Sequence, residues 1–162
     1  MTIATADIWD AYADELTLLN LNLKSFGKKT SFYGEVITLK LYEDNSYVRK
    51  ILTESGKNKV LVIDGGGSRR CALVGDQIAK LAVVNNWEGI IVYGCIRDSK
   101  VINEMEIGIK ALGTCPVKSI KRDVGILGED LLIKGTTIKQ GQYIYADEDG
   151  VLLATRNVLG NR

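Results

Sequence analysis

Two short, continuous apolar runs constrain the fold of this chain more than any other feature. Residues 60–63 read Val-Leu-Val-Ile, and residues 89–93 read Gly-Ile-Ile-Val-Tyr. Such runs are typical of strands that are buried on both faces. Between them, residues 75–86 carry apolar side chains at helical spacing. A strand, a helix and a strand in this order predict a βαβ unit over residues 60–94, with its two strands parallel and adjacent.

The remaining sequence predicts one mixed α/β domain that spans residues 1–162, because no linker and no internal repeat divides it. A first helix is expected to begin at Thr5 as its N-cap and to continue to Leu19, since Leu16 and Leu19 keep the helical spacing. The other expected elements are a strand at 32–41, a helix at 47–55, and short strands at 107–112, 117–120, 130–133, 143–146 and 151–154.

The chain contains no histidine. This absence excludes Ser-His-Asp triads, Cys-His dyads, histidine general bases and zinc sites built on imidazole. Lysine and arginine number 21 against 20 for the acids, which gives a formal net charge of +1. Nucleic-acid binding relies on clustered Lys and Arg, so no direct nucleic-acid partner is expected. The chemistry is therefore expected to use carboxylates, Arg, Lys, backbone amides or a metal bound through oxygen.

The sequence also indicates a soluble, cytoplasmic protein. No run approaches the ~18 apolar residues of a membrane span, so no membrane partner is expected. Residues 1–10 carry acids where a signal peptide would begin with basic residues. Cys71, Cys95 and Cys115 are widely spaced and form no C-x-x-C pair. This pattern favours reduced thiols in the core over a disulfide framework or a Cys-rich metal site.

Two glycine-containing loops follow the strands of the βαβ unit, at residues 64–68 and 94–98. We expect them to lie side by side at the edge of the sheet where ligands collect in α/β folds. The first loop does not match a phosphate-binding motif, because Arg70 stands where G-x-G-x-x-G requires its third glycine. A tight turn in which glycines adopt positive φ is the favoured interpretation of this loop.

Polar residues at this edge suggest a site for a 2-oxo acid. Arg97 can hold a carboxylate and a keto oxygen with two hydrogen bonds. Asp98 can hold a divalent cation through oxygen or bound water, as Mg²⁺ prefers. A surface ion pair or a helix cap would also explain Arg97 and Asp98. The amides of a helix start favour a carboxylate ligand, and the predicted helix begins with Gly75, Asp76, Gln77 and Ile78.

Three long stretches resemble the RraA family, which holds metal-dependent 4-hydroxy-4-methyl-2-oxoglutarate aldolases and regulators of ribonuclease E activity. They are residues 62–72 (VIDGGGSRRCA), 86–97 (NWEGIIVYGCIR) and 143–151 (YIYADEDGV). Thr5, Asp10 and residues 34–38 fit the same pattern, so the resemblance spans nearly the whole chain. It implies a swivelling β/β/α domain with mixed sheets, and a homotrimer with sites near the subunit boundaries.

The resemblance also implies roles for individual residues. The substrate-binding loop of the family falls on Gly75, Asp76, Gln77 and Ile78. Its pyruvate-binding arginine falls on Arg97, and the aspartate that anchors Mg²⁺ or Mn²⁺ falls on Asp98, which makes this pair the expected catalytic residues. Family aldolases carry Gly or Asp where this chain has Val101. The base that takes the substrate's hydroxyl proton is open among Asp76, metal-bound water and a residue across the trimer interface.

Two functions of different classes therefore remain. The first is a metal-dependent aldolase that cleaves 4-hydroxy-4-methyl-2-oxoglutarate to pyruvate and also decarboxylates oxaloacetate. Such catalysis is electrostatic and needs no Schiff-base lysine. The second is a trimer that binds and inhibits ribonuclease E through protein contacts. A third assignment, a menaquinone methyltransferase, finds no support, because no cofactor loop of the required glycine pattern follows a first strand.

Overall fold

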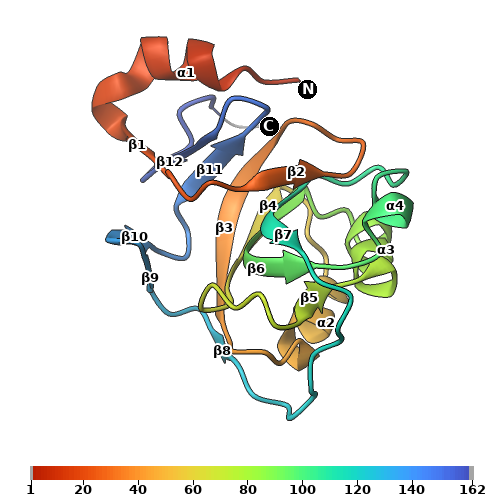
Figure 1. The fold of residues 1–162 in the computed structure, drawn as a ribbon. Coiled ribbons are helices and arrows are strands. Elements are labelled where there is room, and N and C mark those ends of the chain that lie inside the picture. Colours follow the sequence, from red (N-terminus) through yellow and green to blue (C-terminus); the bar gives the residue numbers. More distant parts are fainter. Residues whose placement is uncertain (1, 161–162) are drawn as a thin grey trace.

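Within residues 2–160, which this computed structural model describes, one sheet of ten strands organises the protein. Figure 1 shows how its strands and the helices are arranged. The main path of the sheet is β1-β12-β11-β3-β4-β6-β7-β2, while β5 pairs with β6 and β8 with β3. β9 and β10 form a separate pair. The strands are β1 (Leu16–Leu18), β2 (Lys24–Phe26), β3 (Phe32–Lys40), β4 (Lys59–Asp64), β5 (Ala72–Val74), β6 (Gly89–Ile96), β7 (Ile109–Thr114), β8 (Ile126–Leu127), β9 (Leu131–Ile133), β10 (Thr136–Ile138), β11 (Tyr143–Ala146) and β12 (Val151–Ala154).

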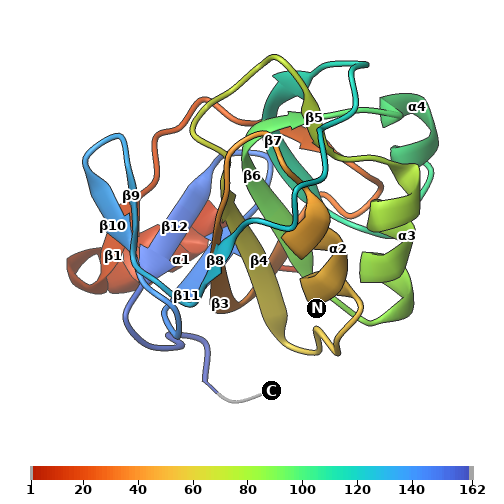
Figure 2. The same ribbon diagram turned by 90° about the horizontal axis from the view of Figure 1, so that it is seen from below.

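The three helices that follow the N-terminal helix lie on one side of the parallel strands, and the β9–β10 pair lies on the other, as Figure 2 shows. The N-terminal helix packs separately against β11 and β12. Among the described residues, none of the helices has the length and apolar character that a membrane crossing requires. The helices are α1 (Thr5–Tyr12), α2 (Ser46–Leu52), α3 (Asp76–Val84) and α4 (Ser99–Ile102), and a 3₁₀ turn, η1, covers Ala13–Glu15.

The predicted βαβ unit is confirmed. β4 and β6 are parallel neighbours, with Val62 opposite Ile91. Leu61 and Ile63 pack on the helical side, in one core with residues of α2 and α3. Val62 and Ile91 pack on the other side, against residues of β9 and β10. Because both faces of these strands are covered, the sequence shows a continuous apolar run instead of an alternating one.

The prediction for the N-terminus is wrong in two respects. The first helix ends at Tyr12, and Leu16 begins β1, where it pairs with Ala154 of β12. Pairing with this distant strand overrides the helical spacing of the leucines. Thr5 is not the N-cap, which is Ala4. The Thr5 amide and hydroxyl instead donate to the buried Asp147 carboxylate at 2.7 and 2.6 Å, and so fasten α1 to the β11–β12 turn.

The sequence also predicts a strand over residues 117–120, and this prediction is wrong: these residues lie in an irregular segment, residues 115–125, between β7 and β8. Its strand-like contact is a single bridge between Lys118 and Ala72. Val117 and Ile120 are exposed, because no strand pairs along this segment to bury their apolar side chains. The other short strands predicted in this half of the chain correspond to β7, β9, β11 and β12. Cys71 and Cys95 are buried free thiols, as expected, while Cys115 is half-buried.

Asp44 fastens the irregular segment to the start of α2. Its Oδ1 accepts hydrogen bonds from the amide and hydroxyl of Ser46 at 2.9 and 2.6 Å. Its Oδ2 accepts from the amides of Arg122 and Val124 at 2.8 and 3.2 Å. Burial would raise the pKa of this carboxyl, but the four hydrogen bonds outweigh burial and lower the pKa from 3.8 to about 2. The ionised carboxylate is therefore part of the folded structure.

Acid should weaken this attachment in a defined pH range. A carboxyl whose pKa is depressed by folding stabilises the protein above its unfolded pKa, and the contribution disappears as the pH falls from about 4 to about 2. The contribution of Asp44 at neutral pH is about 2 kcal/mol. Urea unfolding should show Asp44→Asn less stable than the parent by that amount at pH 7, with the difference closing toward pH 2. A difference that is independent of pH would contradict this account.

Candidate active site

The candidate site lies where β5 and β6 end beside each other. The two strands are parallel, with Val74 paired to Ile96. The amide of Arg97 donates to the carbonyl of Val74 at 2.9 Å. Because parallel strands end at the same edge of a sheet, Gly75 and Arg97 leave the sheet side by side. This geometry brings the start of α3 to the Arg97-Asp98 pair.

Asp98 caps α3. Its Oδ2 accepts a hydrogen bond from the amide of Asp76 at 3.0 Å, and its backbone is left-handed, with φ of 58°. The Oδ1 of Asp76 accepts from the amide of Gln77 at 2.9 Å. The helix cap that the sequence allowed for Asp98 is therefore present. It also means that two amides expected to face a ligand are bonded to the protein's own carboxylates.

Gly75 is required by the close approach of the two segments. A Cβ at this position would lie 2.9 Å from Oδ2 of Asp98 and 3.5 Å from Nε of Arg97. The first distance is shorter than carbon–oxygen packing permits, so any side chain would push Asp98 off the helix start. The glycine that precedes α3 thus lets the carboxylate and the guanidinium reach the same place.

Arg97 keeps most of its hydrogen-bonding capacity. It is half-buried. Among residues 2–160, its guanidinium donates one hydrogen bond, to the backbone carbonyl of Pro116 at 3.5 Å. This distance is at the outer limit of a hydrogen bond. A guanidinium has five N–H donors, so several remain for a carboxylate and a keto oxygen.

A cavity of about 100 Å³ unites all six residues predicted from the sequence. One wall is formed by the start of α3 and by Arg97 and Asp98. A second wall comes from the start of α2 and from the irregular segment, and sequence reasoning missed it. It consists of Asn45, Arg49, Lys118, Ser119 and Lys121. Its three cationic residues could have been noticed as a basic cluster only if the fold had already been known.

A divalent cation could be held at the Asp98 side of this cavity. Asp98 and Asp76 both line it, and each uses one carboxylate oxygen in the hydrogen bonds at the helix start. No group of three or more His, Cys, Asp or Glu side chains suited to a metal occurs within residues 2–160. Mg²⁺ commonly binds through one or two carboxylates and keeps several waters, so this donor set suits Mg²⁺ better than a fully enclosed metal centre.

The glycine loop after β4 forms a tight turn, as favoured from the sequence. Gly66 and Gly67 have φ of 68° and 74°. Oδ1 of Asp64 accepts from the amide of Gly66 at 2.8 Å, and the amides of Gly65 and Gly67 both donate to the carbonyl of Tyr93 at 3.1 Å. Amides used inside the turn are not available to cradle a phosphate.

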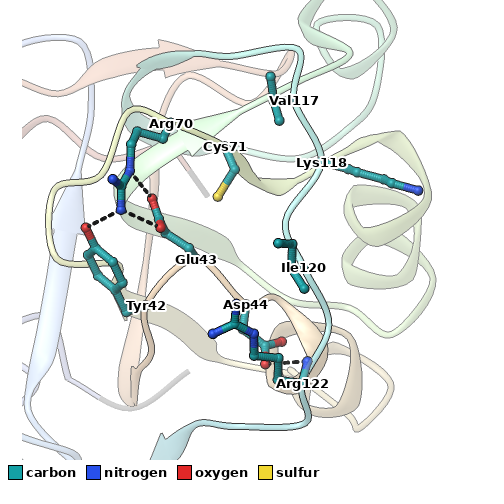
Figure 3. Close-up of a pocket in the computed structure, with 9 residues that line it drawn as sticks. All are labelled: Tyr42, Glu43, Asp44, Arg70, Cys71, Val117, Lys118, Ile120 and Arg122. Atoms are coloured by element: carbon teal, nitrogen blue, oxygen red, sulfur yellow. Dashed lines mark hydrogen bonds and ion pairs between the residues drawn. The ribbon is translucent and has the colours of Figure 1, made fainter.

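A second cavity, of about 320 Å³, lies next to the first and shares Lys118 with it. Figure 3 shows an ion pair on its wall, in which Arg70 donates to Glu43 at 2.7 and 2.8 Å and to the hydroxyl of Tyr42 at 3.2 Å. The hydrogen bonds from Arg70 lower the pKa of Glu43. Burial raises the pKa of Cys71, so this thiol is not activated. In the same view Lys118 extends away from Glu43.

Comparison with known proteins identifies related sequences over the full length. A family model described as RraA-like, Aldolase/RraA, matches residues 5–153. A protein of Dechloromonas aromatica (strain RCB), described as a proposed 4-hydroxy-4-methyl-2-oxoglutarate aldolase, is 51% identical over 158 residues, which cover 95% of this chain and 97% of that protein.

Two solved structures have the same fold. One, from Geobacillus kaustophilus HTA426, is described as an S-adenosylmethionine:2-dimethylmenaquinone methyltransferase. It is 43% identical, has a TM-score of 0.95, and covers 99% of both chains. The other is the RNA-processing inhibitor RraA from Thermus thermophilus, which is 40% identical, has a TM-score of 0.92, and covers 98% of both chains. The expected mixed α/β fold with a mixed sheet is thus confirmed.

Proposed function

Because the chain belongs to the RraA-like family, we propose that it is an aldolase that cleaves 4-hydroxy-4-methyl-2-oxoglutarate, the reaction assigned to relatives about half identical to it. The observation that carries the proposal is the single cavity that holds Arg97, Asp98 and the start of α3. A guanidinium and carboxylates at the end of a parallel sheet suit an anionic 2-oxo acid and the cation that accompanies it.

Arg97 would bind the pyruvyl end of the substrate. In retro-aldol cleavage the C3–C4 bond breaks and its electron pair moves into the C2 carbonyl, which becomes the enolate of pyruvate. The C4 hydroxyl loses its proton as C4 becomes the carbonyl of a second pyruvate. The negative charge that develops on the C2 oxygen lies beside the guanidinium, which is already in place and needs no reorganisation. We assign the hydroxyl proton to Asp76, whose carboxylate lines the cavity. Transfer of that proton to C3 of the enolate completes the other pyruvate and restores the Asp76 carboxylate.

Asp98 would hold the divalent cation, Mg²⁺ or Mn²⁺, and Asp76 beside it stays free to take the hydroxyl proton. When bound there, the cation supplies Lewis-acid stabilisation of the same developing charge. The hydrogen bond from the amide of Asp76 fixes the position of the Asp98 carboxylate at 3.0 Å from that nitrogen. Decarboxylation of oxaloacetate produces the same enolate of pyruvate, so Arg97 and Asp98 would support it as a side activity. Val101 lies exposed in α4 and lines no wall of this cavity.

We also propose that the protein is a homotrimer. Several apolar side chains of the segment that borders the site are exposed, and a second copy could cover them. They are Val117, Ile120, Val124, Ile126 and Leu127. Static light scattering at micromolar concentration should give three times the mass of one 17.8 kDa chain. A monomer mass under these conditions would contradict the proposal.

Inhibition of ribonuclease E is the second candidate function, favoured by the 40% identity to the RNA-processing inhibitor RraA over 98% of both chains. This function would use the outer surface of the protein and would not need the cavity. The two functions are therefore separable by changes inside the cavity.

Replacing Arg97 with lysine should remove most of the turnover. Lysine keeps the charge but lacks the planar fork that holds two oxygens together. The loss of transition-state stabilisation should be about 2–4 kcal/mol, which lowers kcat/KM roughly 30- to 1,000-fold. Pyruvate release measured with a coupled assay tests this, with Arg156→Lys, in an exposed ion pair with Glu15, as the matched control. Parent-like kcat/KM in Arg97→Lys would place the site elsewhere.

Asp98→Asn should separate the two candidate functions. An asparagine oxygen can still accept the amide of Asp76, so the fold should persist, while the charge that anchors Mg²⁺ is lost. Metal-dependent pyruvate release should fall at least tenfold, and inhibition of ribonuclease E should be unchanged. Asp130→Asn removes the same charge from an exposed pair with Lys139 and serves as the control. Undiminished pyruvate release with the same Mg²⁺ dependence would rule out Asp98 as the anchor.

A further inference from the structure

Asn45 is the one residue of the cavity, among residues 2–160, with a buried side-chain polar atom that has no hydrogen-bond partner. It precedes α2 and belongs to the second wall of the cavity that Arg97 also lines. Only 8% of its surface is exposed, and its Oδ1 is buried without a hydrogen-bond partner among residues 2–160. Native proteins rarely leave a buried acceptor unpaired, because the lost hydration is not replaced.

The position of Asn45 suggests a helix cap, but its side chain makes no capping hydrogen bond. Asp44 satisfies the start of α2 instead, through the amide and hydroxyl of Ser46. The backbone amide of Asn45 donates to the hydroxyl of Ser119 at 3.2 Å, and any residue except proline could make that bond. The side-chain amide therefore has no structural task that would require asparagine here.

The neighbours of Asn45 differ from it in hydrogen-bonding character. Arg49, Lys118 and Lys121 line the same wall and offer only donors, which suit carboxylates. Oδ1 of Asn45 is an acceptor, so it repels carboxylate and keto oxygens and needs a donor. Ionised 4-hydroxy-4-methyl-2-oxoglutarate carries two carboxylates, one keto oxygen and a single donor group, the hydroxyl at C4.

We propose that Oδ1 of Asn45 accepts a hydrogen bond from the C4 hydroxyl of the bound substrate and thereby selects hydroxylated 2-oxo acids. The proposal rests on the proposed aldolase function and adds a specificity-determining residue to it. The hydroxyl has one hydrogen, so it points to Asn45 in the bound substrate and turns toward Asp76 before the proton leaves. Oxaloacetate has no hydroxyl at the corresponding carbon, so Asn45 contributes nothing to its binding.

Replacement of Asn45 should therefore affect two substrates differently. Asn45→Leu keeps the branched heavy-atom shape of the side chain and removes the unpaired acceptor, so its Tm should equal or exceed that of the parent if the larger methyl groups fit. Its KM for 4-hydroxy-4-methyl-2-oxoglutarate should rise about tenfold, while its KM for oxaloacetate stays within about twofold. Asn45→Ala should show the same selectivity if leucine does not fit. Asn20→Leu, at an exposed position between β1 and β2, is the control and should leave both KM values unchanged.

The outcomes separate this inference from the proposed function. Equal KM increases for both substrates, or none, would overturn the role of Asn45 while leaving the aldolase in place. If the parent releases no pyruvate, calorimetric titration with Mg²⁺ present gives an independent test, using 4-hydroxy-2-oxoglutarate and 2-oxoglutarate, which differ only in the hydroxyl. The parent should prefer the hydroxylated ligand about tenfold and Asn45→Leu should show no preference. A parent without that preference would contradict the inference.

Discussion

The hydrogen bond from the amide of Asp76 to the carboxylate of Asp98 connects the two chain segments on which the rest of the site depends. It forms because β5 and β6 run parallel and end together, with the Arg97 amide bonded to the Val74 carbonyl. The contact leaves no room for a side chain at residue 75, which explains the glycine there. One carboxylate thus caps the start of α3 and also lines the cavity in which we place the cation.

The second wall of the cavity depends on another carboxylate. Asp44 accepts two hydrogen bonds from amides of the irregular segment and two from Ser46 at the start of α2, and so joins the two segments that bring Lys118 and Asn45 to the cavity. The polar side chains of the cavity region differ in whether the protein itself supplies their hydrogen-bond partners. Asp98 and Asp44 have their protein partners, whereas Oδ1 of Asn45 has none among the described residues. A buried polar atom left unpaired in a residue that lines a cavity is expected where a ligand completes the bonding.

Sequence analysis predicts the elements that depend on the local pattern of apolar residues. It fails for elements whose conformation is determined by contacts with residues distant in the sequence. The βαβ unit was predictable because strands covered on both faces give continuous apolar runs. Leu16 was assigned to a helix because its spacing fits one, and only its pairing with Ala154 makes it a strand residue. β5 has three residues and no pattern of its own. The six site residues came from motifs, but Asn45 reaches the site through contacts with Ser119, 74 positions away, which no local signal reveals.

The most direct test of the account is pyruvate release by the unaltered protein from 4-hydroxy-4-methyl-2-oxoglutarate, with Mg²⁺ and then with excess EDTA. The cavity that joins Arg97 and Asp98 predicts cleavage in the presence of Mg²⁺, with two pyruvates formed per substrate consumed, and its loss when the cation is removed. Pyruvate formation no faster than in the absence of protein, at any Mg²⁺ concentration, would contradict the assignment of this cavity as an aldolase site.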